Sequence, residues 1–388
     1  MSSSVPIPFS EPPWLMGLPS PYYNASHRKW QKTCRALVDE LLGDAGDWEK
    51  EGDVPVRQRQ LSNPQSSLSP PCKMAQGTRD HSPPGDLPVE EFDYMHTLIF
   101  TDEMHRSGSL GPSGAITTGF AFGVPPILKF GSQALQARFL PDLLTGKKRI
   151  CIAITEPGAG SDVSAIETTA RKSDDGSEWI VDGSKKWITN GLWSDYATMA
   201  VRTGGAGPAG GQTAAGTTFI ELDNVRVPRE NLIGTEGSGM KYIMQNFNHE
   251  RLSISISVNR IARTALSQAF EYVMKRKAFG KPVMDQPVVR NRLARCGAEL
   301  ESHWAWIEGF TWMMTRLGEE DANRIFREIP GARIPGGSED VMLDLSIRQL
   351  VKNYQAKMKM KNELEETGLE RPRGVRNYEL VEGGVNDR

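Results

Sequence analysis

The stretch TEPGAGSD at residues 155–162 follows the apolar run CIAI at 151–154. A short apolar run bounded by Gly and Pro is typical of a strand that ends in a turn. The glycines allow a backbone to approach a ligand closely, and Thr155 and Ser161 offer hydroxyl donors. A Gly-rich turn of this composition is also common without any ligand. By itself, therefore, the stretch indicates a β unit and leaves its purpose open.

The residues after this turn continue the β pattern. EWIV at 178–181 and SKKWIT at 184–189 flank Asp182-Gly183, a dipeptide that suits the positive φ angles of a tight hairpin. We therefore predict a hairpin there, and a further strand with a turn in FIELDNVRVP at 219–228. Trp187 and Thr189 would share one face of a strand, where an aromatic plane and a hydroxyl can meet one ligand. A core Trp beside a solvated Thr is the plainer alternative.

Helical patterns flank this β unit. Trp30, Cys34, Leu37 and Leu41 recur at spacings of four, three and four, which predicts one face of an amphipathic helix. Similar periodicity runs over 92–104 and 127–148 and, after the β unit, over 240–275 and 293–317. The order predicts an α+β fold with a helical domain at 1–149, a middle β domain at 150–234 and a helical domain at 235–388.

Two segments are too polar to contribute to a core. Residues 63–88 are dense in Pro and Ser, and residues 203–218 are mostly Gly, Ala and Thr. Such compositions bury too little apolar surface to offset the entropy of ordering the chain. We predict a mobile loop at the first segment and a loop that interrupts the β domain at the second.

The bulk composition limits the partners. The chain of 388 residues carries 46 Lys and Arg against 48 Asp and Glu, a net charge of -2 that provides no broad basic field for a nucleic acid. Its mean hydropathy is -0.44 and no apolar run reaches the roughly 20 residues that span a bilayer, so we expect a soluble protein. Cys34, Cys72, Cys151 and Cys296 lie far apart, so neither a disulfide framework nor a metal site is indicated.

We find no clear targeting signal at the ends of this sequence. MSSSVPIPFSEPPW lacks the basic start and apolar core of a signal peptide, and the terminal VNDR is not of the SKL type. We expect an intracellular protein, cytoplasmic by default, with its compartment left open.

A third motif, RKAFG at 276–280, closes the long predicted helix. Cations there favour the helix dipole in any case, although Arg276 could also hold an anion bidentately. TEPGAGSD, WITNG at 187–191 and RKAFG are individually weak signals, but their joint order is specific. With these motifs the chain resembles the acyl-CoA dehydrogenases, whose pattern is T-E-P-x-A-G-S-D, W-I-T-N-G and R-x-x-F-G.

The resemblance implies a noncovalently bound FAD. Thr155 and Thr189 would hydrogen-bond the flavin ring and Trp187 would lie against it, while Ser161 would face the substrate. Arg276 and Gln286 would reach the dinucleotide of a neighbouring subunit, which implies a homo-oligomer. The remaining positions that the resemblance assigns to the cofactor are Ile188, Gly337 and Ser338, and to the substrate Arg251.

The position of the catalytic base divides the family. Many members carry a glutamate near the C-terminus, and at that place this chain has Gly336. A smaller group, which includes isovaleryl- and long-chain acyl-CoA dehydrogenases, has its base in an E-R-L motif on the long helix, here Glu250-Arg251-Leu252. A Glu-Arg pair on a helix is usually a solvated face, but the resemblance assigns Glu250 as the base. His249 is expected to line the pocket or the surface.

The chemistry implied is removal of a proton and a hydride from adjacent carbons of an acyl thioester. Glu250 would take the α proton and flavin N5 the β hydride, which yields a trans-2-enoyl thioester. The flavin ribityl hydroxyl and a backbone N–H near Gly336 would stabilise the charge that develops on the thioester oxygen. Burial against the acyl chain would raise the pKa of Glu250 towards the working pH.

The chain also departs from the family. Between Leu317 and Ile325 the family has a further helix and a Q-I-x-G-G-x-G loop that holds the FAD pyrophosphate, and neither is present here. A bundle that lacks one helix would expose apolar neighbours, such as Trp304, Trp306, Phe310 and Trp312. We predict weaker FAD retention and lower stability than in full-length relatives, which melting temperatures with and without added FAD would test.

Three functions follow from these observations. The leading one is dehydrogenation of a branched or long acyl-CoA or carrier-bound acyl chain, with an electron-transfer flavoprotein or a similar acceptor. An acyl-CoA oxidase that uses O₂ is the near alternative. A truncated, non-catalytic paralogue or the product of a mistaken exon boundary is the alternative of another class.

Overall fold

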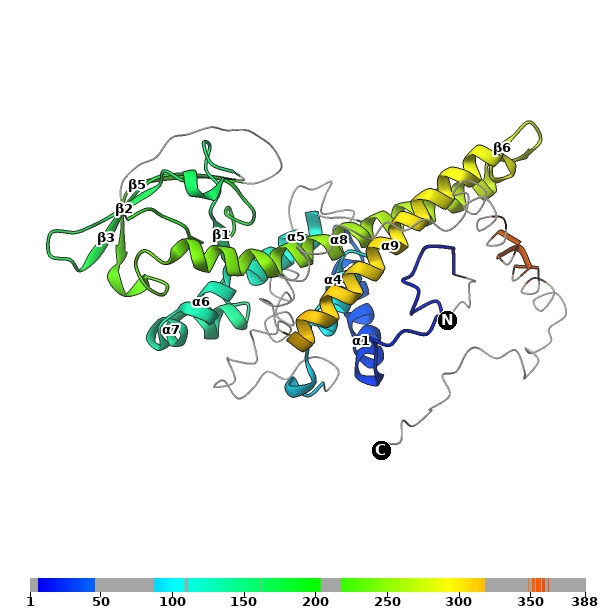
Figure 1. Ribbon diagram of the computed structural model, residues 1–388. Coiled ribbons are helices and arrows are strands. Elements are labelled where there is room, and N and C mark those ends of the chain that lie inside the picture. The colour runs from blue at the N-terminus through cyan, green and yellow to red at the C-terminus, as the bar shows by residue number, and fades with distance from the viewer. Residues whose placement is uncertain are drawn as a thin grey trace.

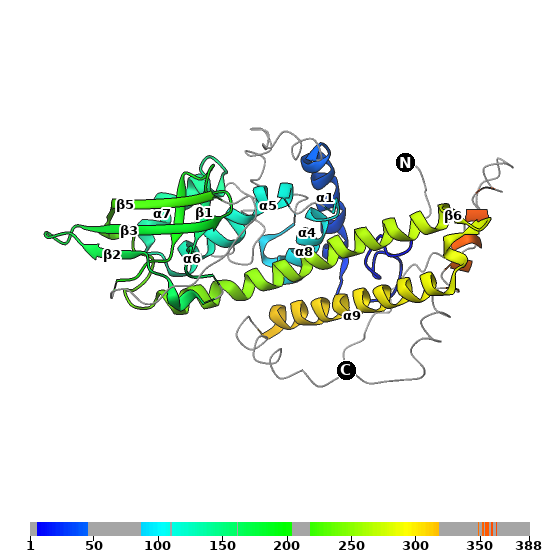
Figure 2. The ribbon, with the colours of Figure 1, turned by 90° about the horizontal axis from the view of Figure 1, so that it is seen from above.

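The computed structural model describes residues 6–45, 87–108, 111–160, 162–203 and 218–317, together with 348, 351, 352, 354–356, 358, 359 and 362. Two long helices, α8 (Gly239–Lys275) and α9 (Pro287–Leu317), lie side by side. A β unit lies at one end of α8, and a small hairpin joins α8 to α9 at the other end (Figures 1 and 2). The predicted order helix, sheet, helix is confirmed, and with it the α+β fold.

The first N-terminal helices pack on the middle of α8 and on α9, and the last two pack beside the β unit, near the start of α8. They are α1 (Ala25–Leu42), α4 (Tyr94–Met104), α5 (Gly111–Thr118), the π-helix η4 (Gly119–Gly123), α6 (Pro125–Phe130) and α7 (Gln133–Leu144), with a 3-10 turn, η3, at Val89–Glu91. The predicted face of α1 is confirmed, because Trp30, Cys34 and Leu41 are buried in one cluster with Trp304 of α9. The loop predicted at 63–88 falls outside the described residues apart from its last two positions.

The β unit holds two sheets in the part of the chain that the structure describes. β1 (Ile150–Ala153) pairs in parallel with β4 (Tyr196–Met199). β2 (Thr169–Lys172), β3 (Glu178–Ile188) and β5 (Thr218–Pro228) form an antiparallel sheet in the order β2-β3-β5. Short 3-10 turns, η5 (Val163–Ala165) and η6 (Arg229–Asn231), flank these strands. The predicted interruption at 203–218 falls, except for residues 203 and 218, outside the described residues.

The predicted hairpin at Asp182-Gly183 is wrong, because β3 runs unbroken through this dipeptide. The turn is made instead by a second Asp-Gly pair, Asp175-Gly176, where the Asp175 carboxylate accepts hydrogen bonds from Ser173 Oγ at 2.6 Å and from Ser177 N at 3.1 Å. Gly183 has φ 143, and a Cβ there would lie 2.7 Å from Thr168 Cα. Gly183 is therefore needed for close packing inside the sheet and does not form a turn.

The turn predicted within 219–228 is a β-bulge in a continuous strand. Val181 pairs with Val225 and Gly183 with Leu222, so two residues of β5 face the single residue Asp182. Asn224, one of the two, has φ 48, and its backbone N–H donates to the Asp182 carboxylate at 2.6 Å. A bulge of this kind bends the strand without ending it.

The C-terminal unit confirms both predicted long helices. The strands β6 (Lys277–Ala278) and β7 (Lys281–Pro282) join them through a turn at Phe279, whose side chain is 97% exposed, and η7 (Val283–Asp285) leads into α9. Trp304 is only 1% exposed, so its predicted exposure is wrong, whereas Trp306 and Trp312 are exposed. Trp304 lies in the apolar cluster that includes Trp30, and the Arg263 guanidinium of α8 lies 5.7 Å from the centroid of its ring. No helix among the described residues has the length and apolar character needed to cross a membrane.

Candidate active site

The loop after β1 is held against the end of β3. The Thr155 carbonyl accepts a hydrogen bond from Lys186 N at 2.8 Å, next to Trp187. Glu156 and Ala159 close a tight turn through Glu156 N to Ala159 O at 2.9 Å and Ala159 N to Glu156 O at 3.2 Å. The turn that was predicted from its glycines therefore presents Thr155 beside the WITNG residues.

The end of β3 has an unusual backbone. Trp187 has φ 62 and Asn190 has φ 67, values that a bulky residue such as Trp rarely adopts. Strain of this kind persists where the surrounding structure imposes it and is frequent at binding sites. Ile188 is buried, while Trp187 and Thr189 are half-buried. Thr189 follows the end of β3 at Ile188, so Trp187 and Thr189 do not share one face of a strand as predicted.

A π-helix connects this end of the sheet to α8. A Cβ on Gly119 of η4 would fall 2.1 Å from the Ile150 carbonyl of β1 and 4.0 Å from Asn190 Nδ2. At the other end of η4, the Phe122 carbonyl accepts a hydrogen bond from Asn246 Nδ2 of α8 at 3.2 Å. Short π-helical turns are rare and frequently occur at functional sites. The WITNG loop and the Asn246 turn of α8 therefore border the same element.

Glu250 lies one turn after Asn246 on α8. One carboxylate oxygen, Oε2, is buried and has no hydrogen-bond partner among the described residues. Burial raises the pKa of Glu250 above its ordinary value, and the nearby Arg251 opposes this only in part. Arg251 itself is exposed, with its guanidinium 5.7 Å from the centroid of the Phe247 ring. The E-R-L motif thus places its Glu inward and its Arg outward. Ser161 and the His249 side chain lie outside the described structure.

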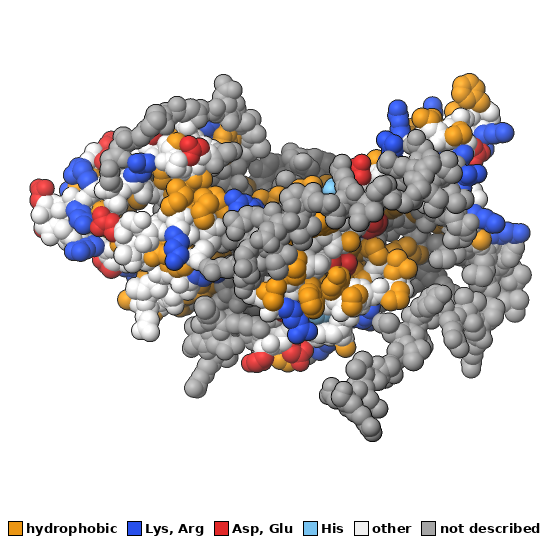
Figure 3. Space-filling view, viewed as in Figure 1, with side chains coloured by type: hydrophobic (Ala, Val, Ile, Leu, Met, Phe, Trp, Pro, Cys, Tyr) orange, Lys and Arg blue, Asp and Glu red, His pale blue; other side chains and the backbone are white. Residues whose placement is uncertain are grey.

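Arg276 and Gln286 lie at the far end of the molecule. Arg276 follows Glu250 by 26 residues of one helix, which corresponds to about 39 Å. Its carbonyl accepts from Val283 N at 2.8 Å, so the β6–β7 hairpin and Gln286 sit with it. Basic side chains gather at this end (Figure 3), among them exposed Lys275, Lys277 and Lys281. One chain therefore does not bring Arg276 and Gln286 to Glu250. Gly336, Gly337 and Ser338 fall outside the described residues.

Known proteins match nearly all of the chain. The N-terminal, middle and C-terminal domains of acyl-CoA dehydrogenases match residues 87–147, 151–245 and 237–322. The chain is 52% identical to the acyl-CoA dehydrogenase apdG of Emericella nidulans, over 91% of this chain and 97% of that protein. It belongs to the acyl-CoA dehydrogenase family. An acyl-CoA dehydrogenase of Alternaria alternata is 35% identical over 80% of this chain and 77% of its own length.

Solved acyl-CoA dehydrogenases share the fold. The butyryl-CoA dehydrogenase of Megasphaera elsdenii aligns over 79% of this chain and 85% of its own, with a TM-score of 0.64 and 22% identity. An acyl-CoA dehydrogenase of Bacillus anthracis, solved in complex with FAD, aligns over 86% of this chain and 58% of its own, with a TM-score of 0.63 and 21% identity. The chain is therefore an oxidoreductase of the acyl-CoA dehydrogenase family with the fold of its relatives.

Three side chains at the site of this acyl-CoA dehydrogenase were not predicted from the sequence. Lys185 and Glu156 form a buried ion pair behind Thr155, and Asn246 anchors α8 to η4. A signal existed for Lys185, since a lysine between apolar stretches of one strand must find a partner if it points inward. Asn246 gave no comparable signal, because an Asn on a helix is ordinarily solvated.

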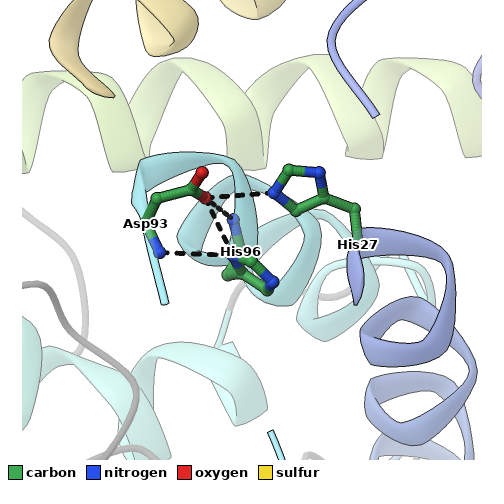
Figure 4. A group of neighbouring side chains, drawn as sticks. All are labelled: His27, Asp93 and His96. Carbon is green, nitrogen blue, oxygen red and sulfur yellow. Dashed lines mark hydrogen bonds and ion pairs between the residues drawn. The ribbon is translucent and has the colours of Figure 1, made fainter. Parts of the chain in front are cut away.

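A separate cluster of His27, Asp93 and His96 has the composition of a metal site (Figure 4). Its ring nitrogens already lie at helix caps. His27 Nδ1 accepts from Asn24 N at 3.1 Å at the start of α1. His96 Nδ1 lies 3.2 Å from Asp93 N and 2.8 Å from Asp93 Oδ1 at the start of α4. The His27 proton is then on Nε2, which faces Asp93 Oδ1 at 3.2 Å. A metal ion at His27 Nε2 would require this nitrogen to lose its proton. The proton would then move to Nδ1, which could no longer accept the hydrogen bond from Asn24 N, so the cluster is a pair of linked caps.

Proposed function

We propose that this chain removes the α proton and the β hydride of an acyl thioester, with FAD as its cofactor and Glu250 as its base. The observation that carries the proposal is the buried, unpartnered carboxylate oxygen of Glu250, on the turn of α8 that is linked through η4 to the WITNG loop. A carboxylate without donors is costly to bury and is poised to accept a proton.

The residues at the end of β3 fit a flavin ring. Thr155 and Thr189 would offer hydroxyl donors to the ring, and the half-buried Trp187 would offer an aromatic face that its strained backbone holds in position. Arg276 and Gln286, with the basic residues around them, would hold the anionic dinucleotide of a second copy. When bound, FAD supplies the acceptor for the hydride.

Glu250 performs the proton transfer. Its raised pKa means that the carboxylate binds a proton more tightly than an ordinary glutamate, which favours abstraction of the weakly acidic α proton of a thioester. The hydrogen bond from Asn246 to the Phe122 carbonyl fixes the position of this turn of α8 relative to η4. Glu250 is thereby oriented by an anchor one turn away, and the proton remains on its carboxylate until solvent removes it.

The substrate is an acyl-CoA or a carrier-bound acyl thioester. We infer a branched or long chain from the position of the base on the long helix. The proposed electron acceptor is an electron-transfer flavoprotein or a similar carrier. The proposed assembly is a homo-oligomer, because Arg276 and Gln286 lie far from Glu250 of their own chain and would complete the site of a second copy.

The visible absorption spectrum of the purified protein tests this function. We expect a flavin spectrum that is bleached when an acyl-CoA is added without oxygen, and no peroxide when oxygen is admitted during turnover. Peroxide formed in step with turnover would identify an oxidase. A chain that takes up no flavin even with added FAD would contradict the proposal.

A further inference from the structure

Lys185 lies entirely inside the protein behind the Thr155 loop. Its side chain is 0% exposed, and Nζ donates to the Ile154 carbonyl at 3.0 Å and to Glu156 Oε1 at 2.6 Å. The residues before and after Thr155 are therefore held by one ammonium group. Thr155 itself is held by Lys186 N, so three successive residues of the loop are attached to two successive residues of β3.

Glu156 extends these attachments to the neighbouring segment. Its side chain is 4% exposed, and the carboxylate accepts from Thr168 N at 3.1 Å and from Glu167 N, just before β2 begins. Thr168 Oγ1 in turn donates to the Ser184 carbonyl of β3 at 3.3 Å. The loop, β3 and the start of β2 thus meet at one ion pair.

Both members of the pair remain charged. Burial alone would raise the pKa of Glu156, but the hydrogen bonds from Lys185 and the backbone donors hold it below its ordinary value. Burial lowers the pKa of Lys185, which the pairing with Glu156 opposes. A buried ion pair is seldom the most stable way to fill a core, because desolvation offsets much of the attraction. Its distinctive contribution is geometric, since charged hydrogen bonds are short and directional.

We propose that Lys185 and Glu156 are positioning residues that set the place of Thr155 relative to Trp187, and so the seat and environment of the flavin ring. This inference rests on the proposed function. Neither residue would contact the ring itself, and both would act through Thr155. The loop would keep its chain path without the pair but would lose its fixed distance from β3.

The test compares Lys185→Met with a control that removes an equally buried basic side chain from an ion pair elsewhere. Arg263 is also 0% exposed, and it donates to both carboxylate oxygens of Glu301 at 2.7 Å. It follows Glu250 by 13 residues on α8, or about 20 Å, so Arg263→Met should destabilise the fold without reaching the flavin. For each full-length variant we would measure the melting temperature, the dissociation constant for FAD and the visible flavin spectrum.

We expect both variants to melt at a lower temperature than the original protein. Only Lys185→Met should also weaken FAD binding, on the order of tenfold, and blur the shoulders of the flavin absorption bands, which report the polarity and rigidity around the ring. Glu156→Gln, which keeps the shape and one oxygen acceptor, should shift the same two properties in the same direction by less.

Two results would overturn the proposal in distinguishable ways. An original protein that binds no FAD removes the proposed function and this inference together. An original protein that binds FAD, with Lys185→Met indistinguishable from Arg263→Met in affinity and spectrum, leaves the function intact and reduces the pair to a structural one. If Lys185→Met does not fold, the spectrum and affinity of Glu156→Gln decide between these outcomes.

Discussion

Two glutamates at the candidate site, the buried Glu156 and the half-buried Glu250, have opposite surroundings. Glu156 accepts hydrogen bonds from Lys185 and from two backbone N–H groups, and its pKa is lowered. Glu250 has one oxygen without any partner in the structure, and its pKa is raised. Burial raises the pKa of each carboxyl group, so the donors around it decide whether its pKa ends below or above the ordinary value. The first is suited to keep a charge for structural purposes, and the second to accept a proton.

The largest expected effect is on catalysis, and it tests whether Glu250 is the proton acceptor. Glu250→Gln should lower turnover by about 10²- to 10⁴-fold, because an amide cannot accept the proton. The flavin spectrum should be unchanged. Glu230→Gln, an exposed change in η6, serves as the control and should leave turnover as it was. Turnover that survives Glu250→Gln would show that the base lies elsewhere.

The next largest effect is on stability, and it tests whether the charge of Glu156 has a structural role. Glu156→Gln should lower the free energy of unfolding by roughly 3 kcal/mol, because it leaves the Lys185 charge buried without its counter-ion. Glu250→Gln should cost little or even stabilise, since it removes a charge that no donor satisfies. Urea unfolding of both variants measures the difference. Equal losses would mean that the two environments do not differ as the hydrogen bonds indicate.

A pH series separates the two carboxylates without mutation. Glu250 must be ionised to act, so kcat/KM should fall as the pH decreases through its raised pKa, at a midpoint above the ordinary 4.5. Glu156 has a lowered pKa, so its contribution to stability is present above the unfolded value and is lost only as the pH falls through the lower folded one. Activity should therefore be lost before the fold. Loss of both at the same pH would contradict the assignment.

The smallest effect concerns a third buried carboxylate, Asp102. Burial raises its pKa to about 7, even though Arg260 NH1 lies 3.3 Å away and Glu103 adds to the increase. Because the folded pKa exceeds the ordinary 3.8, this group favours the folded state at acid pH and loses that contribution as the pH rises through 7. Asp102→Asn should flatten the change in melting temperature between about pH 5 and about pH 8. An unchanged slope would indicate that Asp102 stays ionised beside Arg260.

Much of the fold was predictable because it depends on local patterns. The apolar spacing of α1, α8 and α9 is visible in the sequence, and the joint motifs indicated the α+β fold and the candidate base at Glu250. The hairpin at Asp182-Gly183 was mispredicted because two Asp-Gly pairs were available. Turn chemistry alone cannot distinguish them, since strand pairing selects Asp175-Gly176 and uses Gly183 for close packing on Thr168.

The sequence was enough to predict the order of the helical and β units and to single out the motif residues at the end of β3 and Glu250 on α8. Three features became visible only in the folded chain: Lys185 pairs with Glu156, Asn246 anchors α8 to the Phe122 carbonyl, and Trp304 points inward. The physical reason is that periodicity and turn preference belong to neighbouring residues. The burial of a charge or an amide is tolerated only if a partner distant in the sequence arrives at hydrogen-bonding distance.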